Sequence, residues 1–181
     1  MALYLIRHGE TPAGKAYIGR TDAPLSTVGW EQMTAALKGY SPQQFAAIYS
    51  SPLQRCAAFA EQWSNSGHLL EPALQEYDFG ILDGLSGAEA YADHRDVLLA
   101  FWEDPVNGTP PQAEQLRHFE QRVTHALSKI AKHHGDEDVL IFTHGGVIKL
   151  AIAHLRQQSL HTMFEIEAPH ASVHRLDWSH T

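Results

Sequence analysis

The sequence has little cysteine, a deficit of positive charge and no long apolar run, and each shortage excludes a class of protein. A single cysteine, Cys56, rules out an internal disulfide and fits a reducing compartment, so we expect a cytoplasmic protein. No stretch approaches the roughly 18 apolar residues of a membrane helix, and the N-terminus has no secretory pattern. The net charge of −8 argues against non-specific binding to nucleic acid, so an anionic ligand would need a local positive pocket.

Internal repeats, low-complexity tracts and linkers are also missing, so the length predicts one domain, residues 1–181, with a well-buried core. Histidine is abundant instead, with 13 residues. We interpret several histidines as surface residues because they lie in polar or terminal stretches without metal-ligand spacing: His133, His134, His161, His170 and His180. Metal sites also favour cysteines or grouped carboxylates beside the imidazoles, and the sequence has no such cluster.

Strand-like and helix-like stretches alternate along the chain, which predicts an α/β fold: a three-layer αβα sandwich with a mostly parallel sheet. Strands are expected at 2–7, 46–50, 68–71, 138–143 and, at the sheet edge, 172–178. Helices are expected at 27–38, 52–65, 87–103, 112–133 and 145–156. The second helix is predicted to begin with Ser51 as N-cap and Pro52 as its first residue. The apolar face of the fourth helix is predicted to be core: Leu116, Phe119, Val123, Leu127 and Ile130.

Two of the predicted strands are followed directly by a histidine and a glycine. His8 follows Arg7 at the end of the first strand, and His144 follows the strand 138–143. Parallel neighbours lie ~4.8 Å apart, so adjacent strands would bring both imidazoles to one edge, where open α/β sheets present their ligand sites. We interpret His8 as a nucleophile toward phosphorus and Arg7 as half of a clamp for phosphoryl oxygens.

Two further residues are expected in the same crevice. Arg55 falls in the first turn of the helix after the second strand, where free backbone N–H groups favour an anion. Glu76 lies where the third strand gives way to a glycine-marked turn. Either side chain alone would more simply be a solvated surface group, so the site depends on the convergence of all four segments.

Four segments of the chain resemble the histidine phosphatase superfamily, with its phosphoglycerate-mutase-like fold, and they occur in the family's order. They are Arg-His-Gly-Glu-Thr at 7–11, Ser-Ser-Pro-Leu-Gln-Arg at 50–55, Glu-Tyr-Asp-Phe-Gly at 76–80 and Thr-His-Gly-Gly at 143–146. Residues 19–26 are similar to the family's loop before its first helix. Length and layout are most similar to the α-ribazole phosphatase branch of cobalamin biosynthesis.

The resemblance implies a phosphatase without metal or other cofactor, acting on a small phosphate ester. Its catalytic residues would be His8, Glu76, Arg7, Arg55 and His144, with Arg7, Arg55, His144, Gly19 and Gly145 binding the substrate. In the hypothesis for the mechanism, His8 forms a phosphohistidine, while a carbonyl of the following loop fixes its tautomer. Glu76 would protonate the leaving alkoxide and then take a proton from the attacking water.

Two departures from the family pattern concern the mouth of the site. Gly14 stands six residues after His8, where many mutase-like members place an asparagine that touches the phosphate. That contact must come from elsewhere or be absent. Leu82-Asp83-Gly84 stands where many relatives have tryptophan, glutamate and glycine, which affects the shape of the substrate mouth.

Residues 84–110 form a predicted helical insertion over the active site and are the natural specificity element. They contain one arginine, Arg95, which counts against a glycolytic mutase or a bisphosphatase. Tyr91, Phe101 and Trp102 could stack on the dimethylbenzimidazole of α-ribazole 5′-phosphate, or could merely pack the insertion onto the body. The alternatives are a broad-specificity phosphatase or small mutase, a silent phospho-ligand binding module and a histidine-rich metal-binding protein.

Overall fold

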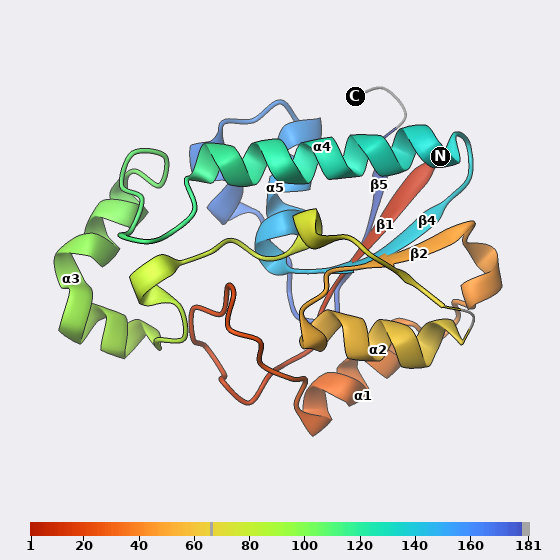
Figure 1. The fold of residues 1–181 in the computed structure, drawn as a ribbon, viewed down its shortest axis with the longest axis horizontal. Helices are drawn as coiled ribbons and strands as arrows, with labels where there is room; N and C mark the ends of the chain where they lie inside the picture. Colours follow the sequence, from red (N-terminus) through yellow and green to blue (C-terminus); the bar gives the residue numbers. More distant parts are fainter. Residues whose placement is uncertain (66, 179–181) are drawn as a thin grey trace.

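A mixed sheet of five strands forms the middle layer of the fold, in the order β3-β2-β4-β1-β5 (Figure 1). The computed structural model describes residues 1–65 and 67–178, so His180 lies outside the described residues. The strands are β1 (Ala2–Arg7), β2 (Ala47–Ser50), β3 (Leu69–Leu70), β4 (Val139–Thr143) and β5 (Val173–Asp177). β5 is antiparallel to β1, whereas the other neighbouring pairs are parallel. The mostly parallel sheet with an edge strand is therefore confirmed.

Helices cover both faces of this sheet, as the alternation of elements predicted. α1 (Thr27–Ala36) and α2 (Gln54–Ser64) lie on one face, and α4 (Leu116–His134) and α5 (Gly145–Leu155) lie on the other. The remaining α-helix, α3 (Gly87–Glu103), belongs to the insertion. Val139 and Ile141 of β4 pack into the core beneath α4 and α5, while Leu140 and Phe142 pack on the opposite side with α1 and α2. β4 is buried along its whole length because it is covered on both faces.

Two predicted helix starts are wrong. α2 begins at Gln54 with Leu53 as its N-cap, while the Ser51 hydroxyl accepts from the N–H of Leu53 at 3.3 Å and also lies 2.7 Å from Nε2 of His144. α4 begins at Leu116 rather than at 112, because the preceding residues form a turn in which Gln112 has a positive φ of 64°. The predicted apolar face of α4 is nevertheless buried throughout. Within the described residues, no helix has both the length and the apolarity needed to cross a membrane.

β1 and β4 are adjacent, and this pairing positions the site. Their register places Arg7 opposite Thr143, so the histidine after each strand emerges at the same edge of the sheet. The backbone N–H of His8 donates to the carbonyl of Thr143 at 3.0 Å, which extends the ladder by one bond. The insertion, with α3, lies beyond this edge of the sheet (Figure 1).

Candidate active site

His8 is held by its own loop in one tautomer. Its Nδ1 lies 2.8 Å from the carbonyl oxygen of Gly9, and because a carbonyl only accepts, Nδ1 carries the proton. Nε2 therefore keeps its lone pair and makes no hydrogen bond to the described residues. Burial, followed by the nearby Arg55 guanidinium, holds the pKa of His8 well below its usual range. The side chain is a neutral, oriented imidazole at physiological pH, with the loop carbonyl that the sequence predicted.

His144 and Arg55 lie behind His8 and are fully buried. The rings of His8 and His144 have their centroids 5.2 Å apart, so the two imidazoles do meet at one edge. His144 Nε2 is 2.7 Å from the Ser51 hydroxyl. Arg55 donates through Nη1 and Nη2 to three loop carbonyls, those of Ile18, Gly19 and Thr21. Part of the guanidinium expected to hold phosphate therefore holds the loop.

Arg7 and Arg55 each keep a buried donor that has no hydrogen-bond partner among the described residues. Arg7 donates through Nη1 to the carbonyl of Ala168 at 2.7 Å, while its Nε is buried without a hydrogen bond. The Nε of Arg55 is in the same condition. Burial lowers the pKa of each guanidinium, although Glu76 opposes this effect. Because an unpaired buried donor on a cation costs about 1–3 kcal/mol or more, this geometry suits a bound anion.

Glu76 is buried and held at both carboxylate oxygens. Oε1 accepts from the N–H of Tyr77 at 2.9 Å, and Oε2 accepts from the N–H of Gly146 at 2.9 Å. A Cβ on residue 146 would collide with Oε1, so the carboxylate needs the glycine. The second glycine after His144 thus makes room for Glu76, while Gly145 packs against the guanidinium of Arg7.

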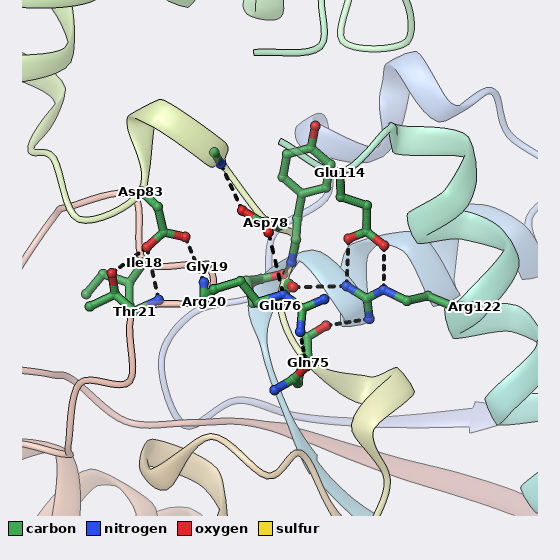
Figure 2. A network of polar contacts seen from close by, with 12 residues as sticks. Ile18, Gly19, Arg20, Thr21, Gln75, Glu76, Asp78, Asp83, Glu114 and Arg122 are labelled. Atoms are coloured by element: carbon green, nitrogen blue, oxygen red, sulfur yellow. Dashed lines mark hydrogen bonds and ion pairs between the residues drawn. The ribbon is translucent and has the colours of Figure 1, made fainter. Parts of the chain in front are cut away.

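Arg122 of α4 fixes the backbone that carries Glu76 (Figure 2), a role that could not be predicted from the sequence. Its Nη1 donates to the carbonyls of Ala73 and Gln75, and its Nη2 donates to that of Glu76 at 3.0 Å. A two-point ion pair with Glu114, with distances of 2.6 and 2.8 Å, orients the guanidinium. Arg122 and Glu114 are 46 and 38 residues from Glu76 in sequence, so no local pattern could reveal the contact.

Asp83 holds the loop of residues 18–21 (Figure 2), and Arg55 contacts the same loop. Its carboxylate accepts from the N–H groups of Arg20 at 2.7 Å and Thr21 at 3.0 Å, while Arg55 binds carbonyls of the same loop. Gly19, which is predicted to bind the substrate, is packed tightly against the Tyr77 carbonyl, Asp83 and Phe79. Asp83, which stands where many relatives have glutamate, therefore has a structural role in this chain: it holds the loop.

Two cavities meet at Glu76. The first has a volume of about 260 Å³ and is lined mainly by polar groups, among them Arg7, His8, Lys15, Glu76 and His170. The second, of about 180 Å³, is bounded by aromatic rings and one lysine, among them Phe79, Trp102, Phe119, Phe164 and Lys149. Arg7, Glu76 and Phe79 border both. The Glu76 carboxylate therefore lies between a mainly polar cavity and a mainly aromatic one.

His170 belongs to the first cavity, which corrects its interpretation as a surface residue. Its ring centroid is 5.5 Å from that of His8. The direction of β5 explains why this prediction was wrong. An antiparallel edge strand begins at the edge where its parallel neighbours end, so the residues that precede β5 reach the site. Among the other histidines, His134 contacts Tyr49 and His161 contacts Asp104. The part of the chain that the structure describes has no group of three metal-ligating side chains placed to hold an ion.

An α/β sheet with an oriented imidazole, two buried guanidinium groups and a carboxylate at one edge defines a phosphate-ester site of the histidine phosphatase kind. The chain belongs to the histidine phosphatase superfamily, branch 1, whose family model matches residues 3–181. It is accordingly a phosphatase of this superfamily.

Named relatives of the chain differ in their substrates. The metal-independent phosphoserine phosphatase of Arabidopsis thaliana is 30% identical over 166 residues, 87% of this chain and 69% of that protein. The adenosylcobalamin/alpha-ribazole phosphatase of Escherichia coli is 29% identical over 163 residues, 86% and 79% of the two chains. The structure of Bacillus stearothermophilus YhfR has a TM-score of 0.88 at 28% identity, covering 97% of this chain and 90% of that one. Some relatives are longer: the chain spans 43% of three mycobacterial proteins that are 34% identical to it.

Proposed function

We propose that the protein is a phosphomonoesterase that forms a phosphohistidine on His8, with α-ribazole 5′-phosphate as its substrate. The observation that carries the proposal is the neutral His8 imidazole, held through Nδ1 by the Gly9 carbonyl, with Nε2 free at a cavity that Arg7 and Glu76 border. A nucleophile in a fixed tautomer, next to cations and a carboxylate, is what a two-step phosphoryl transfer requires.

The reaction follows from this placement. The Nε2 lone pair of His8 attacks phosphorus, the bond to the ester oxygen breaks, and Glu76 in its acid form gives the leaving oxygen a proton. Water then attacks the phosphohistidine and passes its proton to Glu76, which restores both groups and releases phosphate. Arg7 and Arg55 stabilise the charge on the equatorial oxygens through their unpaired Nε donors. Glu76 borders both cavities, so the leaving group would occupy the aromatic one.

The aromatic cavity supports a substrate with a flat, apolar leaving group. Phe79, Trp102 and Phe164 offer ring faces and edges there, as the dimethylbenzimidazole of α-ribazole requires. Of the three aromatic residues expected to stack, only Trp102 is suitably placed. Phe101 is buried against Tyr77 and packs the insertion onto the body, and Tyr91 is exposed beside Arg95. The E. coli relative named for α-ribazole fits the same conclusion.

A substrate panel tests this proposal. We expect kcat/KM in the presence of EDTA to be higher for α-ribazole 5′-phosphate than for phosphoserine, 3-phosphoglycerate or p-nitrophenyl phosphate. Trp102→Ala should lower the value for α-ribazole phosphate by a factor of about 2 to 13, because one aromatic contact is worth about 0.5–1.5 kcal/mol. Its effect on phosphoserine should be smaller.

Leu99→Ala is the matched control, since Leu99 lies on the same helix and is similarly exposed. A preference for phosphoserine, or equal losses on every ester in the Trp102 variant, would contradict the substrate assignment. Interconversion of phosphoglycerates faster than their hydrolysis would favour the mutase alternative.

Gly146→Ala should reduce turnover by about 100-fold, because the new Cβ displaces the carboxylate of Glu76, and a shift of about 1 Å can cost that much. The loss should appear in kcat, with the inhibition constant of inorganic phosphate nearly unchanged, since Arg7 and Arg55 stay in place. Gly87→Ala is the control, because a Cβ there meets no atom within 4 Å. Full activity of the Gly146 variant would argue against the role of Glu76.

A further inference from the structure

A third imidazole, that of His170, lies near His8 and borders the same cavity. The ring centroid of His170 is 5.5 Å from that of His8, and His144 lies at 5.2 Å. His170 borders the same cavity as Arg7, His8 and Glu76. The mechanism proposed above makes no use of it.

The position of the His170 ring is fixed by the backbone at the end of β1. Its Nδ1 lies 3.2 Å from the carbonyl oxygen of His8, which also accepts from the N–H of Ala171 at 3.3 Å. Ala171 has φ 56°, a left-handed conformation that a residue with a Cβ adopts only when its surroundings enforce it. A turn closed by Ser172, whose N–H and hydroxyl both donate to the Pro169 carbonyl, provides that enforcement.

This arrangement leaves one nitrogen of His170 for a ligand. The carbonyl of His8 can only accept, so Nδ1 carries a proton and Nε2 is the unprotonated nitrogen of the neutral ring. Nε2 lies 3.5 Å from Nη2 of Arg7, at the long limit of a hydrogen bond. Gly14 borders the cavity too, with open space where a side chain would be. His170 is thus a fixed polar side chain at a part of the cavity to which Gly14 contributes none.

We propose that His170 is a further substrate-contacting residue, whose Nε2 shares one proton with an equatorial oxygen of the phosphoryl group. A substrate monoanion would donate its P–O–H to Nε2, and a dianion would accept from the protonated ring. The two descriptions contain the same atoms and differ only in whether the shared proton is written on the phosphoryl oxygen or on Nε2. No bond to phosphorus is made or broken. The inference rests on the proposed function, because it assumes that this cavity holds the phosphoryl group.

The charges around His170 determine when that proton is bound. Arg7 is the last residue of β1, His8 follows it, and Glu10 and Lys15 belong to the next loop, while Glu76 borders the same cavity. Burial, and then Arg7, lower the pKa of His170, while Glu10 opposes them. The ring is therefore neutral in the free protein near pH 7. A phosphate monoester, whose second pKa is about 6, is mostly a dianion there, so binding should take up a proton.

Calorimetric titration with inorganic phosphate at pH 7.5, in two buffers of different ionisation enthalpy, measures this uptake. The wild-type protein should take up a large fraction of a proton, short of one because inorganic phosphate at pH 7.5 is a mixture of the dianion and the already protonated monoanion. His170→Ala should weaken phosphate binding at least about tenfold, which is the loss of one charge-assisted hydrogen bond. His170→Asn should restore affinity to within about threefold, because its amide donates without titrating, but should take up fewer protons than the wild type.

His118→Asn is the matched control, since His118 is exposed on α4 and should behave as wild type in affinity and uptake. Unchanged affinity in His170→Ala, or unchanged uptake in His170→Asn, would overturn the proposal; thermal midpoints show whether each variant is folded. Hydrolysis of p-nitrophenyl phosphate by the wild type tests the proposed function separately. A wild type that binds phosphate with proton uptake but cleaves no ester would refute that function and leave the His170 contact supported.

Discussion

Replacing His8 by asparagine should abolish hydrolysis of phosphate monoesters, with a loss of about 10⁴-fold or more, because the nucleophile of the covalent step is removed. The fold should survive. The His8 side chain makes one hydrogen bond, to Gly9, and the backbone bonds of residue 8 to Thr143 and Ala171 do not depend on its side chain. Phosphate should still bind, since Arg7 and Arg55 are unchanged.

Two measurements separate a lost nucleophile from a damaged site. A phosphohistidine is hydrolysed in acid but survives in alkali. Substrate labelled on phosphorus, followed by alkaline quenching, should therefore leave an acid-labile, alkali-stable label on the wild type and none on the His8→Asn variant. His118→Asn should be labelled like the wild type. A wild type that binds ester but never acquires such a label would favour the silent binding module. A variant that keeps full turnover would exclude His8 as the nucleophile.

Glu76→Gln should lower kcat by about 10²–10⁴-fold on alkyl phosphates, which is the usual contribution of general acid–base catalysis. The loss should be smaller on p-nitrophenyl phosphate, because nitrophenolate leaves without a proton. The carboxylate accepts one N–H at each oxygen, and glutamine offers only one accepting oxygen. One of the two N–H groups therefore loses its acceptor, so we also expect a lower thermal midpoint, from a cost of about 1–3 kcal/mol.

The dependence on the leaving group identifies the role of Glu76, since a merely weakened fold would reduce every rate alike. Glu71→Gln is the matched control. Glu71 also accepts a backbone N–H, from Ala73, and it lies on the same segment of chain. Equal losses on alkyl and nitrophenyl esters in the Glu76 variant would exclude it as the proton donor.

The sequence was enough to predict those parts of the site that lie at the ends of strands. His8 and His144 each follow a buried strand, and adjacency of parallel strands was enough to bring them together. The sequence was not enough for contacts that depend on side chains far away in the chain or on the direction of a strand. Arg122 reaches the carbonyl of Glu76 from another helix, and His170 reaches the site only because β5 is antiparallel. Local periodicity in the sequence reveals neither the contact between Arg122 and Glu76 nor the antiparallel direction of β5.

The start of α2 was predicted two residues too early. Ser51 before Pro52 has the composition of a helix cap, and the local pattern predicts one. In the folded protein the hydroxyl does accept a local backbone N–H, that of Leu53 at 3.3 Å, but the helix begins at Gln54. The same hydroxyl is 2.7 Å from His144, a partner 93 residues away, and that second contact could not be predicted from the local pattern.

The two anchors drawn in Figure 2 have a consequence for how this scaffold can diversify. Asp83 ties the chain to the loop that Arg55 contacts, and Glu114 ties it to Arg122, which holds the backbone of Glu76. Residues 84–113, which include α3, are therefore anchored to the body at both ends. Substitutions within this segment could change which alcohol the protein prefers as leaving group without altering the residues that contact the phosphoryl group.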